Sequence, residues 1–178
     1  MSSKLVNIES KNVLARLMAT ENIHVEHKKV ATASFDVKGR RLILPMWKDM
    51  TNTMYEGLIG HEVGHALYTP HEEWAEFAKT NPHLKDYANI LEDARIERKM
   101  KIKYPGMKKT FFSMYDALSQ KDFFGTKHRE LEDYGFADRL NLHFKLGVLA
   151  DVPFSDEEKV VADRVAKAET FEEILALT

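Results

Sequence analysis

The spacing of apolar residues changes from helical to strand-like along the N-terminal part of the chain. Between residues 7 and 20 apolar side chains recur at helical spacing, which predicts a short leading helix. From residue 30 the pattern becomes two β-rich runs, "VATASFDV" and "RRLILPMW", separated by "KG". These runs predict a β-hairpin, with Pro45 near the end of its second strand, where the missing N–H is tolerated.

Residues 52–68 are predicted to form the next helix. Thr53 and Glu56 have the spacing of a capping box at its start, and Pro70 stands where the helix should stop. Leu58 and Val63 belong to an apolar side that would be half buried. Three glycines, at positions 57, 60 and 64, disfavour a helix, so we expect them to allow close approach of a neighbouring strand or of a substrate.

Helical patterns continue to the C-terminus. Ser155 and Glu158 form a second predicted capping box, directly after a break at Pro153. No repeat or change in composition marks a second domain, so residues 1–178 are predicted to form one α+β domain, an N-terminal hairpin followed mostly by helices. The helices after the hairpin and the first long helix are predicted over 72–80, 84–101, 107–121, 134–149 and 155–176.

The composition describes an ordinary soluble protein, with 44% hydrophobic and 30% charged residues. There is no cysteine, so any metal site must consist of His, Asp and Glu. The net charge of -2 gives no reason to expect nucleic acid or a membrane as partner, and the basic run 98–109 is interpreted as a solvated helix end. Residues 1–23 lack the continuous apolar core of a signal peptide, so a cytoplasmic location is expected.

The sequence "HEVGH" lies inside the predicted helix 52–68 and has the spacing of a zinc peptidase motif. His61 and His65 are one helical turn apart, so both imidazoles can point at one metal ion. Glu62 is rotated by about 100° from His61, which places it beside the metal as a general base. Bound Zn²⁺ lowers the pKa of water and polarises a carbonyl, so the motif predicts zinc-dependent hydrolysis.

A zinc site of this type requires a third protein ligand. His71 is one candidate, because the chain fits H-E-x-x-H-x-x-G-x-x-H except at the glycine position. That position holds Tyr68, which disfavours the sharp turn with positive φ that the pattern needs. Pro70 also stiffens the approach to His71.

The other candidate is a carboxylate from "NILEDARIE", residues 89–97, on a predicted helix. On a helical wheel Asp93 borders the apolar face and can point inward, whereas Glu92 falls on the opposite side and is interpreted as a solvated, ion-pairing residue. An error of one residue in the wheel leaves Glu92 open as the alternative ligand. Asn89 and Glu97 flank Asp93 at one turn and could hydrogen-bond to a ligand or to a ligand histidine.

The pairing of "HEVGHALYTP" with "NILEDARIERKMKIKYPGMKKTF" resembles a group of bacterial and phage zincin-like metallopeptidase domains, which are often joined to a von Willebrand factor A domain. The similarity covers about residues 30–120. It implies a zincin fold with a twisted sheet over the active-site helix, a von Willebrand factor A or ATPase partner, and the host cytoplasm if the protein is phage-encoded. The implied ligands are His61 and His65 with Glu92 or Asp93, and the implied acid/base is Glu62.

Two functions follow as hypotheses. The first is a zinc metallopeptidase that acts on a peptide or protein substrate; the alternative is a non-catalytic zincin-fold module that docks an ATPase or a von Willebrand factor A partner. A peptidase also needs a donor for the developing oxyanion, and no spacing selects one. The oxyanion candidates are Tyr104, Tyr115, His128 and His143.

The edge of the predicted strand in residues 30–37 could pair with an extended peptide, or be merely structural.

Overall fold

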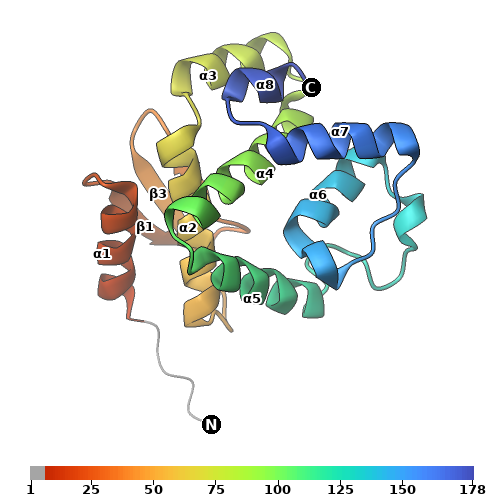
Figure 1. The fold of residues 1–178 in the computed structure, drawn as a ribbon. Helices are drawn as coiled ribbons and strands as arrows, with labels where there is room; N and C mark the ends of the chain where they lie inside the picture. Colours follow the sequence, from red (N-terminus) through yellow and green to blue (C-terminus); the bar gives the residue numbers. More distant parts are fainter. Residues whose placement is uncertain (1–6) are drawn as a thin grey trace.

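Eight α-helices and a three-stranded sheet make up residues 7–178, the part of the chain that the computed structural model describes (Figure 1). Residues 1–6, the beginning of the N-terminal segment considered above, lie outside the described part. The predicted α+β class, with a small N-terminal sheet and mostly helices after it, is confirmed. No helix within residues 7–178 is both long enough and apolar enough to cross a membrane.

The sheet has the strand order β1-β3-β2. β2 (Ser34–Asp36) and β3 (Arg41–Pro45) pair antiparallel, which confirms the predicted hairpin and places Pro45 at the end of its strand. β1 (His24–Lys28) pairs parallel to β3 and was not predicted. The reason is that Val25 is its only apolar side chain, so the strand shows no alternation of apolar and polar residues.

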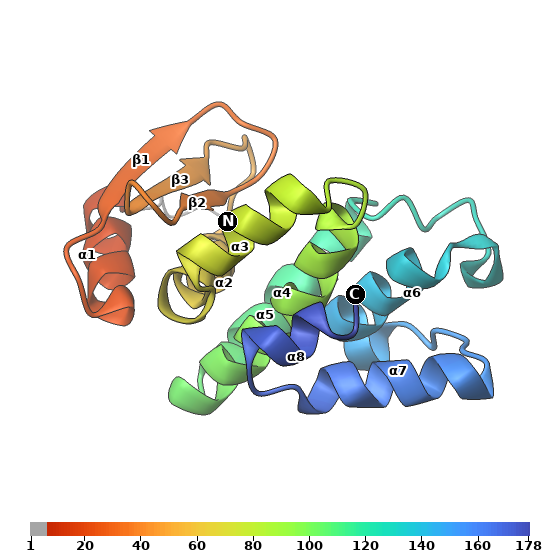
Figure 2. The ribbon, with the colours of Figure 1, turned by 90° about the horizontal axis from the view of Figure 1, so that it is seen from above.

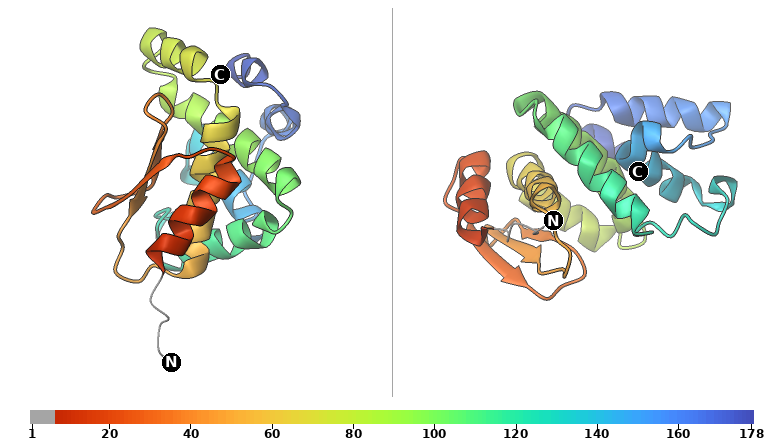
Figure 3. Two further views of the ribbon diagram at one scale, coloured as in Figure 1. Left: turned by 90° about the vertical axis from the view of Figure 1, so that its left-hand side faces the viewer. Right: turned by 90° about the horizontal axis from the view of Figure 1, so that it is seen from below.

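Helices α1 (Ile8–Ala19) and α2 (Asn52–Tyr68) lie side by side over one face of the sheet (Figure 3). The bounds of α2 agree with the prediction, but its cap does not. Thr51, rather than Thr53, is the N-cap, and its side chain accepts a hydrogen bond from the backbone of the third residue after it. Glu56 is therefore free of a capping role and pairs with a lysine of α1 at 2.7 Å.

On the side of α2 away from the sheet, α4 and α5 pack against it (Figures 1 and 2). Gly64 allows the approach of α4, because a Cβ atom there would lie 3.0 Å from the end of Ile96 and 3.2 Å from Met100. The other two glycines of α2 face methionine side chains of α5. The predicted neighbours, a strand or a substrate, were thus wrong, since two helices occupy these positions. The helices of this region are α3 (His71–Thr80), α4 (Lys85–Lys103) and α5 (Met107–Gln120).

The C-terminal helices form a second apolar cluster with α4. The predicted single helix over 155–176 is two helices, because Thr170 and Glu173 form a capping box that starts a new one. The capping box predicted at Ser155 and Glu158 is confirmed. The elements are α6 (Phe136–Leu146), α7 (Asp156–Lys167) and α8 (Phe171–Leu175), with short 3₁₀ turns at Leu131–Asp133 and Gly147–Leu149.

Candidate metal centre

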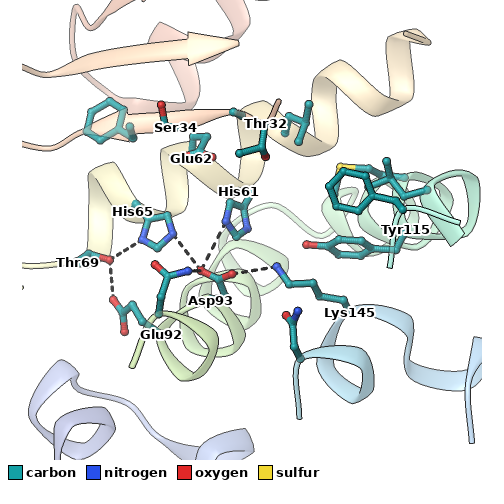
Figure 4. A pocket seen from close by; sticks show the side chains of 18 of the residues that line it. Thr32, Ser34, His61, Glu62, His65, Thr69, Glu92, Asp93, Tyr115 and Lys145 are labelled. Carbon is teal, nitrogen blue, oxygen red and sulfur yellow. Dashed lines mark hydrogen bonds and ion pairs between the residues drawn. The ribbon is translucent and has the colours of Figure 1, made fainter. Parts of the chain in front are cut away.

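Two histidines of α2 and one aspartate of α4 point toward one another and line a cleft (Figure 4). His61 and His65 lie one helical turn apart, as the motif spacing predicts, and Asp93 faces both of them across the α2–α4 contact. Oδ1 of Asp93 lies 3.2 Å from Nε2 of His65 and 3.6 Å from Nε2 of His61. One donor atom from each of the three side chains lies within 4.8 Å of the other two. This is the group that the sequence predicted from the motif and the helical wheel.

The ring of His61 is oriented by a carboxylate on its other side. Its Nδ1 atom lies 3.0 Å from Oε1 of Glu97, which is almost fully buried. Because a carboxylate accepts hydrogen bonds, Nδ1 of His61 is the donor, and its Nε2 atom faces Asp93. Tyr115 donates a further hydrogen bond to the same Glu97 oxygen. Glu97 thus has the supporting position that the sequence predicted.

His65 is oriented through a hydroxyl instead. Thr69 donates to Oε1 of Glu92 at 2.6 Å, so its oxygen can accept the hydrogen bond from Nδ1 of His65 at 3.0 Å. Glu92 in turn accepts two hydrogen bonds from Arg95, both 2.7 Å long. The chain of contacts fixes the ring of His65 with Nε2 toward Asp93.

Glu92 does not lie at the centre. The predicted pairing with Arg95 is present, but the prediction of a solvated side chain was wrong, because Glu92 is 0% exposed. The C-terminal segment accounts for the difference, since Arg95 also donates to the backbone oxygen of Glu169, just before α8. Of the two carboxylates left open by the sequence, the structure brings Asp93, and not Glu92, to the histidines.

Negative charge exceeds positive charge in the buried surroundings of this centre. Glu62, Asp93 and Glu97 are all buried, and one largely buried ammonium group, that of Lys145, lies among them. A second lysine, the partly exposed Lys101, lies 3.6 Å from Oε2 of Glu97. Burial by itself would lower the pKa of His61, but the charge of Asp93 and the hydrogen bond with Glu97 outweigh it and raise this pKa to about 9. The site therefore favours a positive charge between the histidines and Asp93.

A divalent cation fits this arrangement. When both rings are neutral and each Nδ1 atom donates to its acceptor, two imidazole lone pairs and one carboxylate oxygen lie close together. Three acceptor atoms that face one another without a cation or proton between them repel one another. Two imidazoles and one carboxylate are also a common ligand set of catalytic zinc sites, in which the remaining position stays open.

Glu62 lies beside the three converging side chains, as predicted, and lines the same cleft (Figure 4). Burial raises the pKa of its carboxyl group above the ordinary value, and the nearby histidines counteract this increase. A carboxyl group with a raised pKa next to a candidate metal site is suited to take up and return a proton near neutral pH.

The cleft has a volume of about 720 Å³. Residues 32–35 and 37, in and beside β2, are part of its lining, and β2 is an outer strand of the sheet. The lining also includes three aromatic residues, among which the ring of Phe123 makes a tilted contact with Trp47 and an edge contact with Phe124.

The remaining sequence candidates lie elsewhere, with one exception. His71 begins α3 and does not line the cleft. Tyr104 donates to a backbone oxygen of α1, and His143 packs against phenylalanines. His128 is exposed. Tyr115 does line the cleft, although its hydroxyl group already donates to Glu97.

Two residues of the centre were missed by sequence reasoning. Thr69 follows the motif at the end of α2, and its i+4 spacing from His65 could have identified it. Lys145 comes from α6, and its Nζ atom lies 2.9 Å from Oδ2 of Asp93. No sequence pattern connects it with the motif, because the contact depends on how α6 packs against α4.

Replacing Thr69 by valine is expected to lower the affinity for zinc, the predicted cation, by about 10- to 100-fold. Valine has nearly the same shape but leaves Nδ1 of His65 without its acceptor, whereas Thr69→Ser keeps the hydroxyl group and should bind zinc as the parent does. Competition with a chromophoric chelator measures the affinity. Thr80→Val is the matched control, because Thr80 is exposed and donates to an exposed glutamate of α3. Equal affinity of Thr69→Val and the parent would show that the hydroxyl group does not support the site.

Comparison of the chain with protein families, with curated proteins and with solved structures gave no match.

Proposed function

We propose that this protein is a zinc-dependent metallopeptidase with a zincin-like fold, related to the bacterial and phage domains that its two motifs resemble. The observation that carries the proposal is the convergence of His61, His65 and Asp93, with each ring oriented by a partner on its far side and with Glu62 alongside.

His61, His65 and Asp93 would hold the zinc ion. When bound, zinc supplies a Lewis acid that polarises the scissile carbonyl and makes water more acidic. Other side chains of the protein orient these ligands. Glu97 and Thr69 keep the two imidazole rings in the orientation that ligation requires.

Glu62 is the proposed acid/base. Its carboxylate accepts the proton of the attacking water while the water oxygen bonds to the carbonyl carbon. The same proton then moves to the amide nitrogen as the carbon–nitrogen bond breaks, which leaves a free amine and a carboxylic acid. Burial favours this role because it brings the pKa of Glu62 closer to neutral pH.

The proposed substrate is an extended peptide segment. The outer strand β2 borders the cleft, so backbone groups of a substrate could pair with its free edge and pass over Glu62. Ser34 and Thr32 lie on the side of the cleft where this pairing would take place (Figure 4).

Purification followed by metal analysis and a peptide-cleavage assay tests the proposal. We expect about one zinc ion per chain, cleavage of an unstructured protein or a mixed peptide library, loss of cleavage after treatment with a chelator, and its return on addition of zinc. A chain without zinc would contradict the proposal. Zinc binding without cleavage would instead favour the alternative, a zincin-fold module that docks an ATPase or a von Willebrand factor A domain.

A further inference from the structure

Lys145 takes no part in holding the zinc ion or in proton transfer by Glu62, although its side chain reaches the candidate centre. It lies in the last turn of α6, and its side chain is only 14% exposed. Its ammonium group lies 2.9 Å from Oδ2 of Asp93 and 5.5 Å from the centre of the Tyr115 ring (Figure 4). Burying an ammonium group costs several kcal/mol unless partners compensate for it, so its presence here calls for a physical explanation.

Asp93 uses its two carboxylate oxygens for different purposes. Oδ1 faces the two histidines, and Oδ2 faces Lys145. The carboxylate has a further support, because Nδ2 of Asn89 lies 3.4 Å from Oδ1. A neutral donor would have been enough to hold Oδ2, so orientation of Asp93 alone does not explain why the group is a cation.

The ammonium group also has unused hydrogen-bonding capacity. It carries three N–H donors. Within residues 7–178, Asp93 is the one hydrogen-bond acceptor of Lys145, and the side chain lines the cleft. Donor capacity therefore remains for a group that enters the cleft next to the three converging side chains.

We infer that Lys145 stabilises the negative charge that develops on the carbonyl oxygen of the scissile peptide bond. The inference rests on the proposed peptidase function. When the oxygen of water bonds to the carbonyl carbon, the π electron pair of the carbonyl bond moves onto the carbonyl oxygen, and the proton of the water moves to Glu62. When the carbon–nitrogen bond breaks, that pair returns to form the carbonyl of the product acid and the proton goes to the leaving amine. The charge on oxygen exists only between these events, so an ammonium group beside it accelerates the reaction.

Two other donors that line the cleft, Tyr115 and Lys85, are less suited to this role. The hydroxyl group of Tyr115 is engaged with Glu97. Lys85 also lines the cleft, but it is exposed at the start of α4, two helical turns before Asp93. Lys145 is the lysine that combines burial with direct contact to the side chain of the centre.

Lys145→Gln and Lys145→Met separate the catalytic role from support of Asp93. Glutamine can still donate a hydrogen bond to Asp93 but has no charge. Methionine has neither a hydrogen-bond donor nor a charge. We expect both variants to contain as much zinc as the parent and to show KM within about threefold of it. Their kcat should fall by about 100-fold or more, the usual effect of removing one oxyanion donor. Lys145→Arg should recover part of the loss, because it restores a cation.

The matched control is Lys159→Met, which removes an exposed lysine of α7 and should leave all of these values unchanged. Thermal unfolding confirms that each variant is folded. Loss of zinc from Lys145→Gln would overturn the inference, because Lys145 would then act only by supporting Asp93. An unchanged kcat, or an effect on KM alone, would also overturn it. Absence of cleavage by the zinc-loaded parent would overturn the peptidase proposal together with this inference, whereas cleavage by parent and variants alike would overturn the inference alone.

Discussion

Glu62→Gln is expected to lower kcat for peptide cleavage by about 100- to 10,000-fold or more, the range that general acid–base catalysis contributes, while zinc content stays at the parent level. Glutamine has the size and shape of glutamate, so the buried position can accommodate it without a cavity. Its amide cannot take the proton from water. Since Glu62 does not belong to the three converging side chains, the ligands remain in place. Measuring kcat on a fluorogenic peptide, together with metal analysis of the same sample, gives both values.

Glu76→Gln provides the matched control, because Glu76 is an exposed glutamate of α3 outside the cleft. It should cleave the peptide at the parent rate. If Glu62→Gln were as active as this control, Glu62 would not be the base. If neither the parent nor any variant cleaved while all bound zinc, the docking-module alternative would be the better account.

Local periodicity was sufficient to predict the two helices that form the centre. The i and i+4 spacing of His61 and His65 is a property of any α-helix, and helical geometry also selected Asp93 over Glu92 as the inward-facing carboxylate. Asn89 and Glu97 followed from the same rule. The structure brings these side chains close together, and the part of this arrangement that was predictable concerns side chains on one helix, where the backbone alone fixes relative direction.

Predictions that depended on packing between distant segments were incomplete. Glu92 was expected in solvent, but Arg95 and the segment that leads into α8 bury it. Lys145 was not identified, because it lies on another helix, 52 positions after Asp93 in the chain. β1 was not predicted for a related reason. It forms a strand by pairing with β3, and its own residues show no apolar pattern that identifies a strand. Such features depend on tertiary structure, which a single-sequence pattern does not contain.

Asp93→Ala is expected to lower the affinity for zinc by more than the roughly 10- to 100-fold that loss of a supporting hydrogen bond causes. The variant leaves two histidines, which rarely hold zinc without a third protein ligand. It also leaves the ammonium group of Lys145 without its carboxylate partner, so the local charge becomes less favourable for a cation. Equilibrium dialysis against buffered zinc measures the effect on folded protein.

Two variants distinguish Asp93 from the other ligands considered. Glu92→Gln should retain zinc but lower the free energy of unfolding by about 3–5 kcal/mol, because it leaves the buried charge of Arg95 uncompensated. His71→Ala should change neither quantity, since His71 begins α3 away from the cleft. Loss of zinc from His71→Ala together with its retention by Asp93→Ala would indicate that the chain closes around the metal through the segment after α2. Loss of zinc from Glu92→Gln at full stability would instead require Glu92 to exchange its ion pair for the metal. Glu92 already has Arg95 and Thr69 as partners, whereas Oδ1 of Asp93 faces two imidazole nitrogens. We therefore expect zinc binding to depend on Asp93 and not on Glu92.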